Sequence, residues 1–358
     1  MKRHLPGILV VLASIVLFLA TLSVWVARQV LDTDDWVNTS SALIRDPAVQ
    51  QATASYVADQ LVDQQVVTDK LQGILPQQLQ RLAPAVAGGV DQLAERATLR
   101  AMRSGAFQGL WDATNRKTHE QFVSLVTGKS DNKVVFDLRP MIGQVAARVG
   151  LGADVVNALP PDRGRITVVK PKELQTAQKI GRVLRPLAWF LVFLMLAGYV
   201  LAVYLAPERR RMLMKAGIGI FFAGLLMLAV RRLLGHVVVD SLAGNGATAP
   251  AAESVWQIGT SLLRQIAASV LFAGVIVMLS AWLAGPASWA TRARAWMTPT
   301  LRDQPLIAYS VAIMALLILL MAGIVPGSAR IVMVLVDLVL VVVGVTALRR
   351  QVIREAAS

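Results

Sequence analysis

The chain contains no cysteine and only three histidines, His4, His119 and His236. The lack of cysteine excludes disulfide bonds, thiolate metal sites and thiol catalysis. Three histidines are too few for a histidine-rich metal site. Charged residues are also scarce, at 16% of the chain. We therefore expect no cofactor, and few side chains are available for catalysis.

Hydrophobic residues make up 55% of the sequence, and the mean hydropathy is +0.57. A soluble domain has a less apolar balance. A helix needs roughly 20 mainly apolar residues to cross a bilayer, and backbone groups in lipid must be satisfied within the structure. The sequence therefore predicts an all-α membrane protein with six transmembrane helices. The predicted spans are Gly7 to Ala27, Pro186 to Ala206, Ala216 to Leu234, Ser261 to Leu283, Leu306 to Val325 and Ile331 to Leu348.

The net charge is +14 and the isoelectric point is about 10.8. Twelve Lys or Arg residues fall in segments that six spans place on one side, against four in the opposite connections and helix ends. This bias predicts a plasma-membrane protein with both termini in the cytoplasm. The basic segments favour contact with anionic lipid headgroups. We expect no nucleic-acid partner, because no basic stretch is interleaved with stacking aromatics.

Four regions follow from this pattern. Residues 1–27 form a cytoplasmic N-terminus and an uncleaved anchor, because the apolar run is long and no clean A-x-A site precedes Asp32. Residues 28–185, with twenty basic and sixteen acidic residues, form an extracytoplasmic domain large enough for its own core. Residues 186–348 form a five-helix transmembrane bundle, and residues 349–358 form a cytoplasmic tail.

The polar block from 28 to 185 has mainly helical patterns. Asp46-Pro47 is an N-cap and N1 pair, and apolar residues follow at helical spacing. Two further stripes are expected to face the core. The first consists of Val86, Val90, Leu93, Ala94 and Ala97, and the second consists of Phe107, Leu110, Trp111, Thr114, Thr118, Phe122 and Leu125. Gly88-Gly89 and Ser104-Gly105 are candidate breaks. Residues 133–138 and 165–170 have strand patterns that predict one small β-ribbon. Outside this block, the sequence predicts an outer loop from Gly235 to Gly259.

Several short motifs resemble a group of uncharacterised actinobacterial integral membrane proteins. They are Leu31–Val37 (LDTDDWV), Asp46–Val49 (DPAV), Val135–Pro140 (VFDLRP), Lys172–Gln175 (KELQ) and the Arg209–Arg211 turn. The likeness covers most of the chain and is weaker over the last two predicted spans. It implies an anchor, an outer helical domain and membrane hairpins, and it carries over no functional residue.

No catalytic motif is complete. Gly128-Lys129-Ser130 lacks the P-loop glycine five residues upstream, where Val123 stands. His119-Glu120 begins like a zinc-protease helix, but Val123 occupies the position of the second histidine. We therefore predict no catalytic residue, and His119 is interpreted as a surface histidine.

Asp32, Asp34 and Asp35 cluster where the chain leaves the first span. Three carboxylates could hold Ca²⁺ or Mg²⁺ at the headgroup layer. The pattern favours the alternative, a helix cap whose acids interact with the helix dipole.

Two further sets are candidates for binding or transport. Arg96, Arg100 and Arg103 share a helix face that could bind anionic lipid or an envelope phosphate polymer, although a solvated face is the more usual role of such a stripe.

Asp337 lies near the middle of the last predicted span, where a charge is costly. It is either part of an ion relay or a buried structural group, and the single intramembrane acid favours the structural role.

Taken together, these patterns predict a non-enzymatic envelope binding, scaffold or sensor protein. Its partners would be the bilayer and a protein or envelope polymer. A transporter or channel subunit that uses Asp337 is the alternative, and an extracytoplasmic hydrolase is the third hypothesis. The sequence leaves the oligomeric state open.

Overall fold

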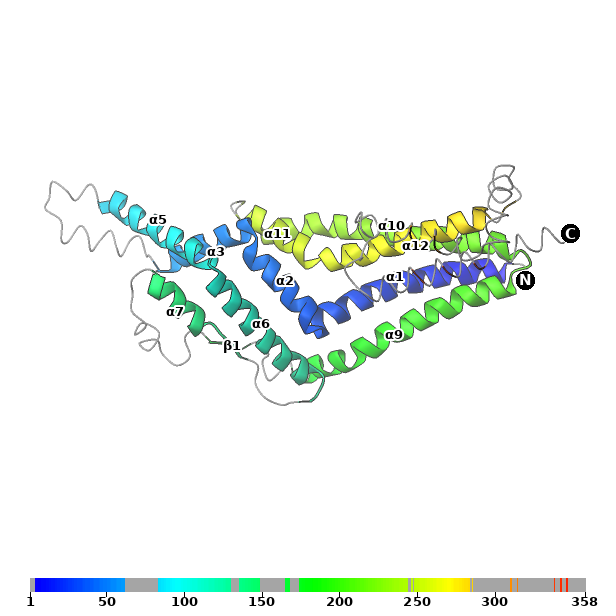
Figure 1. Cartoon of the computed structure of the whole chain (residues 1–358), viewed down its shortest axis with the longest axis horizontal. Coiled ribbons are helices and arrows are strands. Elements are labelled where there is room, and N and C mark those ends of the chain that lie inside the picture. Colours follow the sequence, from blue (N-terminus) through cyan, green and yellow to red (C-terminus); the bar gives the residue numbers. More distant parts are fainter. Residues whose placement is uncertain are drawn as a thin grey trace. The chain divides into compact units, whose positions relative to one another are not determined.

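The computed structural model is mainly helical (Figure 1). It describes residues 4–61, 83–129, 135–148, 165–167, 174–243, 246, 248–283 and 285, with isolated positions at 310, 314, 338, 342 and 346. The described elements are α1 (Leu5–Leu31), α2 (Thr33–Arg45), α3 (Pro47–Leu61), α5 (Ala83–Met102), α6 (Gly105–Val126), β1 (Val135–Asp137), α7 (Arg139–Arg148), β2 (Arg165–Thr167), α9 (Leu174–Leu205), α10 (Arg209–Leu242), α11 (Ala249–Gly259) and α12 (Ser261–Leu283).

Four helices are long and apolar enough to cross a membrane. They are Leu5–Leu31, Gln175–Leu205, Arg209–Leu242 and Ser261–Leu283. These match the first four predicted spans in order and position. The predicted spans at 306–325 and 331–348 lie outside the described residues except at isolated positions. Four of the six predicted spans are therefore present as helices of sufficient length and apolar character, which supports a multi-pass membrane protein.

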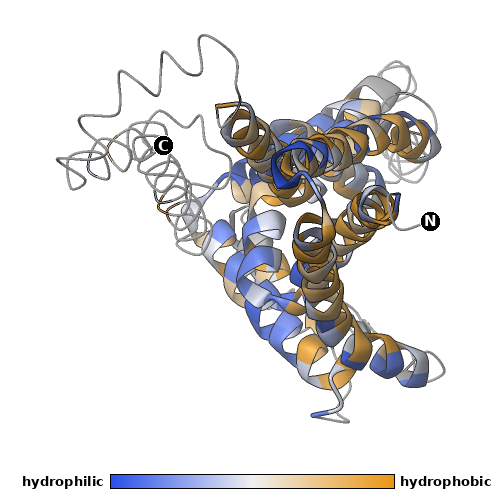
Figure 2. Cartoon of the chain, turned by 90° about the vertical axis from the view of Figure 1, so that its right-hand side faces the viewer, coloured by the Kyte–Doolittle hydropathy of each residue, from blue (hydrophilic) through white to orange (hydrophobic). Residues whose placement is uncertain are grey.

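The chain divides into two compact units. The first, here called the apolar bundle, comprises Met1–Trp25, Pro186–Leu233 and Ser261–Ser358. The second, here called the polar unit, comprises Val26–Arg185 and Leu234–Thr260. Hydrophobic residues cover most of the long bundle helices, whereas the helices of the polar unit carry many hydrophilic residues (Figure 2).

The apolar bundle has a core of small and medium side chains from three helices. This core consists of Val10, Ala13 and Leu17 from α1, Tyr199, Ala202 and Ala206 around the end of α9, and Met212, Ala216 and Ala223 from α10. Large apolar side chains such as Trp189 and Phe193, each 71% exposed, lie on the outside of α9. Small residues inside and large apolar residues outside are the arrangement that suits a lipid environment.

Glycines allow α10 to approach two neighbouring helices. A Cβ on Gly224 would lie 2.8 Å from the backbone nitrogen of Leu271, and one on Gly274 would lie 2.5 Å from that of Phe221. A Cβ on Gly219 would collide with the hydroxyl of Ser14 on α1. Gly219 and Gly224 therefore allow close helix contact, and Ala223 of the same helix lies in the bundle core.

In the polar unit, α2 packs on α6 and α3 packs on α5. A core of Ile44, Met102, Phe107 and Met141 holds these helices together, with Trp111, Phe136 and Leu138 packed against it. Strands β1 and β2 pair antiparallel, with Phe136 opposite Ile166. The predicted ribbon is therefore present, although each strand is only three residues long.

Three local predictions in this unit were wrong. Residues Gly235–Gly259 are not simply a loop, because α10 continues to Leu242 and α11 packs against α2 and α3. Gly88 and Gly89 do not break α5, which runs unbroken to Met102. The stripe predicted on α5 is exposed at Val86, Val90 and Leu93. The buried side of α5 instead includes Thr98, Ala101 and Met102.

Helix α9 runs unbroken through Gly181 and Pro186. A Cβ on Gly181 would lie 2.6 Å from the carbonyl oxygen of Val126, so the glycine allows α9 to touch the end of α6. Near this contact, the side-chain amide of Gln178 donates to the carbonyl of Leu125 at 3.2 Å. Gly181 therefore serves close packing rather than bending.

Candidate functional site

A cavity of about 500 Å³ lies within the polar unit, between α2, α6 and the last turn of α1. Its size falls in the range of small-molecule sites, roughly 300–1,000 Å³. Among the described side chains that line it there is no acid, lysine or arginine. Six of the twelve are apolar or aromatic, and six are polar. The lining residues are Gln29, Val30, Trp36, Thr39, Ser40, Leu43, Trp111, Asn115, Thr118, His119, Phe122 and Phe136.

A helix cap fixes the start of α2, which supplies one wall. The backbone nitrogen of Asp35 donates to the Asp32 carboxylate at 3.0 Å, so Asp32 is the N-cap of α2. This cap begins the helix at Thr33 and brings Thr33 and Trp36 onto the side that meets α6. The predicted capping role of Asp32 is confirmed, and the cap positions Trp36 on the cavity wall and Thr33 beside the His119 ring.

His119 is the central polar residue of the cavity. Its side chain is on α6, and only 5% of the residue is exposed. The imidazole stacks on the Trp36 indole, with ring centroids 5.2 Å apart and planes inclined by 14°. Phe122 borders the ring on another side at 5.8 Å. The interpretation of His119 as a surface residue was therefore wrong, because the first turn of α2 covers it.

Burial lowers the pKa of His119 below its ordinary value of 6.5, since a charged ring loses hydration in this apolar site. The Val30 carbonyl and the Asp32 carboxylate oppose this effect because both favour a protonated ring. The ring is therefore neutral at pH 7. Its Nδ1 atom shares a hydrogen bond of 3.1 Å with the Thr33 hydroxyl, and the direction of that bond depends on the tautomer.

Two buried polar atoms on the cavity wall have no hydrogen-bond partner in the described part of the chain. They are Nε2 of His119 and Oε1 of Gln29. The Val30 carbonyl is near the ring, but no hydrogen bond of acceptable geometry joins it to Nε2. Buried polar groups in native proteins nearly always have a partner, so an unpartnered pair on one cavity points to a missing ligand or water.

The chain matches no protein-family model, no curated protein and no solved structure. The cavity must therefore be interpreted from its own chemistry.

Other polar groups around the cavity are satisfied by nearby backbone. The hydroxyl of Thr39 donates to the Asp35 carbonyl at 2.9 Å, and the Trp111 indole donates to the Ser40 carbonyl at 3.2 Å. The Asn115 amide donates to the Trp111 carbonyl at 3.1 Å. These bonds hold the wall in place before any ligand binds, which lowers the entropy cost of binding.

The three aspartates at the start of α2 do not converge on a metal. Asp35, which is 7% exposed, accepts from Arg28 at 2.9 Å, whereas Asp34 is exposed and accepts from Arg116 at 2.7 Å. This second bond raises the pKa of Arg116. Among the described residues, no group of three or more acidic or histidine side chains is placed to hold a metal ion. The carboxylates serve instead in the cap and in ion pairs.

Arg96, Arg100 and Arg103 are exposed on α5, as both of their proposed roles require. Arg103 donates to the side chain of Gln50 at 3.2 Å, which ties it to α3. Asp337 lies outside the described residues, so its relay and structural roles both stay predictions.

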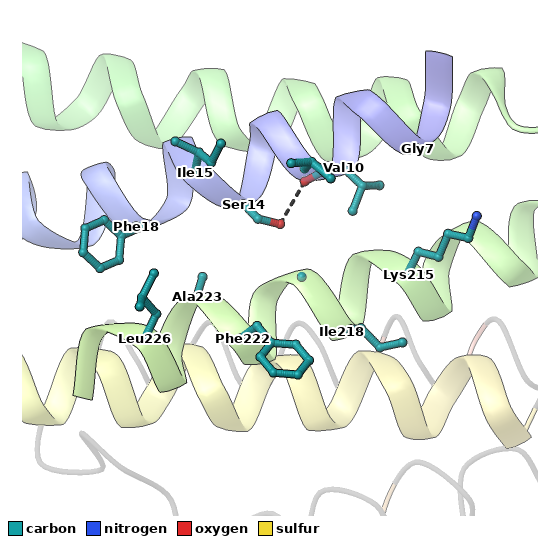
Figure 3. A pocket seen from close by; sticks show the side chains of 12 residues that line it. Gly7, Val10, Ser14, Ile15, Phe18, Lys215, Ile218, Phe222, Ala223 and Leu226 are labelled. Atoms are coloured by element: carbon teal, nitrogen blue, oxygen red, sulfur yellow. Dashed lines mark hydrogen bonds between the residues drawn. The ribbon is translucent and has the colours of Figure 1, made fainter. Parts of the chain in front are cut away.

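A second cavity, of about 600 Å³, lies within the apolar bundle between α1 and α10 (Figure 3). Apolar side chains such as Ile15 and Phe222 line it, and Lys215 lies at the end near Gly7. The hydroxyl of Ser14 is satisfied by the Val10 carbonyl at 2.8 Å. A groove of this composition fits hydrocarbon. Among the described residues that line it, no buried side-chain polar atom lacks a hydrogen-bond partner.

Proposed function

We propose that the protein is a non-enzymatic envelope sensor or scaffold whose polar unit binds an amphipathic envelope molecule in the Trp36–His119 cavity. One observation carries this proposal. The cavity is apolar, of ligand size, and has two buried polar atoms without partners in the described chain. An apolar pocket with a few fixed polar groups is the usual form of a small-molecule site.

In this proposal the polar unit is extracytoplasmic, six helices span the plasma membrane and both termini are cytoplasmic. The positive-inside bias supports this orientation. The last turn of α1 supplies Gln29 and Val30 to the cavity. The cavity then begins where the first span ends, within reach of molecules that move laterally in the outer leaflet.

Binding rather than catalysis is favoured by the chemistry of the wall. Among the described residues that line the cavity, His119 is the one titratable side chain. The Ser40 hydroxyl donates to the Val37 carbonyl at 3.1 Å and the Thr39 hydroxyl donates to the Asp35 carbonyl at 2.9 Å. Neither hydroxyl is therefore hydrogen-bonded to His119, as a nucleophile activated by a histidine base would be.

Photocrosslinking of the full chain in nanodiscs tests the proposal. A long-chain probe with a diazirine near its polar end should label peptides of α2 and α6 that contain Trp36 and Phe122. Leu43→Trp fills the cavity and should lower this labelling by about tenfold, equivalent to about 1.4 kcal/mol of binding free energy. Ala42→Trp adds the same side chain at the exposed neighbouring position and should leave labelling unchanged.

Labelling restricted to the lipid-facing surfaces of the bundle, and unaffected by Leu43→Trp, would show that the cavity does not bind the probe. The proposed function would then fail.

A further inference from the structure

The chemistry of the Trp36–His119 cavity narrows the ligand class. This inference rests on the proposed function, because it concerns the same cavity. The two unpartnered atoms, Gln29 Oε1 and His119 Nε2, need different partners. An amide oxygen only accepts hydrogen bonds, whereas a neutral imidazole nitrogen donates or accepts according to its tautomer.

The Thr33 hydrogen bond is compatible with either tautomer, because a hydroxyl both donates and accepts. In the tautomer in which the Thr33 hydroxyl donates to Nδ1, the ring proton is on Nε2. The cavity then offers one acceptor at Gln29 and one donor at His119. A single hydroxyl group satisfies both, since it donates one hydrogen bond and accepts another.

Charged headgroups fit the cavity poorly. No lysine or arginine is among the described residues that line it, so a phosphate or carboxylate would be buried without a counter-charge from them. Such a burial is strongly unfavourable. The lone pairs of Gln29 Oε1 would also repel an anion. A positively charged headgroup meets a similar objection, because the described lining includes no carboxylate and the nearby Asp32 carboxylate already caps α2.

The remaining wall fits hydrocarbon. Leu43, Phe122 and Phe136 contribute apolar surface, and the Trp36 indole adds an aromatic face. Burial of an alkyl chain against these side chains gains about 25 cal/mol for each Å² removed from water. A small polar solute would leave this surface uncovered.

We propose that the cavity binds an uncharged lipid with a free hydroxyl group, such as a long-chain alcohol or an acylglycerol. The hydroxyl donates to Gln29 Oε1 and accepts from His119 Nε2, and the alkyl chain packs against Trp36, Phe122 and Phe136.

Competition against the photoreactive probe tests the headgroup. Three competitors of equal chain length are compared in nanodiscs of uncharged lipid at neutral pH, namely the alcohol, its methyl ether and the carboxylate. The alcohol should displace the probe at a concentration about tenfold or more below that of the ether, because the ether leaves Gln29 Oε1 unpaired. The carboxylate should compete less well than the alcohol.

Two variants locate the effect. Gln29→Leu should abolish the preference for alcohol over ether, because the alcohol then loses the acceptor that the ether cannot use. His119→Phe should weaken the binding of both competitors and keep the preference, because both oxygens lose the same donor while the alcohol still donates to Gln29 Oε1. Gln92→Leu changes an exposed glutamine of α5 and should keep the preference. The thermal transition of each variant checks that it is folded.

The outcomes separate the two proposals. Equal competition by alcohol and ether, with labelling still in the cavity, would mean that buried water satisfies Gln29 and His119, and would overturn the hydroxyl inference alone. Stronger competition by the carboxylate would overturn it too. No labelling in the cavity with any headgroup would overturn the proposed function itself.

Discussion

The imidazole of His119 stacks on the indole of Trp36, with ring planes only 14° apart. This contact joins α6 to the first turn of α2. Stacked aromatic pairs contribute about 0.5–1.5 kcal/mol beyond the area they bury. A double-mutant cycle with Trp36→Leu and His119→Leu should therefore give a coupling free energy in that range, measured by unfolding of the full chain in detergent.

A second cycle serves as the control. Tyr56 is 65% exposed on α3. Tyr56→Leu combined with His119→Leu should be additive within about 0.5 kcal/mol. A Trp36–His119 coupling no larger than this control would contradict the energetic role of the stack.

The depressed pKa of His119 predicts a pH dependence of stability. Because burial lowers the pKa in the folded state below 6.5, the unfolded chain binds more protons between the two pKa values. The contribution of neutral His119 to the free energy of unfolding should therefore be fully present above about pH 6.5. It should be lost as the pH falls from there through the folded-state pKa. His119→Gln should reduce the slope of melting temperature against pH in this window. An unchanged slope would assign the effect to other groups.

Two aspartates of α2 should differ in their contribution to stability. Asp35 is buried beside Arg28. Removal of one partner of a buried ion pair lowers the free energy of unfolding by up to about 3–5 kcal/mol. The loss should be smaller here, because the Arg28 side chain is one-third exposed. Asp34 pairs with Arg116 at the surface, where such pairs contribute about 0–1 kcal/mol. Asp35→Asn should therefore lower the melting temperature clearly, whereas Asp34→Asn should change it little. Equal effects would show that burial does not distinguish the two pairs.

Gly274 should be intolerant of larger side chains. A Cβ at this position meets the backbone of α10, with the Gly217 carbonyl oxygen 3.0 Å away and the Phe221 nitrogen closer still. Gly274→Val should force α10 and α12 apart and lower the melting temperature in detergent by several degrees, or prevent assembly. Gly7→Val is the matched control, because no atom lies within 4 Å of its added Cβ. Similar melting temperatures for the two variants would contradict the close contact.

The absence of native cysteine makes the topology directly measurable. Single cysteines at Arg100, Ser328 and Arg349 should react differently with a membrane-impermeant maleimide on intact cells. Six spans and an outer polar unit predict labelling at positions 100 and 328, and labelling at 349 only after permeabilisation. Labelling at position 100 but not at 328 would support an outer polar unit and contradict the predicted pair of spans at 306–325 and 331–348. Protection of position 100 would contradict the predicted orientation of the polar unit.

Hydropathy located the four described apolar helices well, because a window of some twenty residues averages over local error. Local capping signals were also reliable, as Asp32 and Asp46 show. Asp46 accepts from the backbone nitrogens of Ala48 and Val49 at 2.9 and 3.1 Å, as its position before Pro47 predicts. Such signals depend on neighbours within three or four residues, which the sequence gives directly.

The cavity could not be predicted in the same way, because its wall is made by residues distant in sequence. The stripe predicted on α6 included Thr114 and Thr118, whereas the structure buries Asn115 and His119 beside them. Hydropathy alone favoured the threonines, and only contact with α2 decides which face is covered. One signal was available, since Phe107, Trp111, Asn115 and His119 follow at intervals of four. Two polar residues on an aromatic helix face indicate a buried polar site.

Helix α1 has a feature with mechanical importance. Ala13 belongs to the bundle core and Gln29 borders the cavity, sixteen positions along one unbroken helix, or about 24 Å. A hydrogen-bonded helix resists compression along its axis, and no turn or glycine interrupts this stretch. Gln29 and Ala13 therefore share one continuous run of backbone hydrogen bonds, with no loop between them.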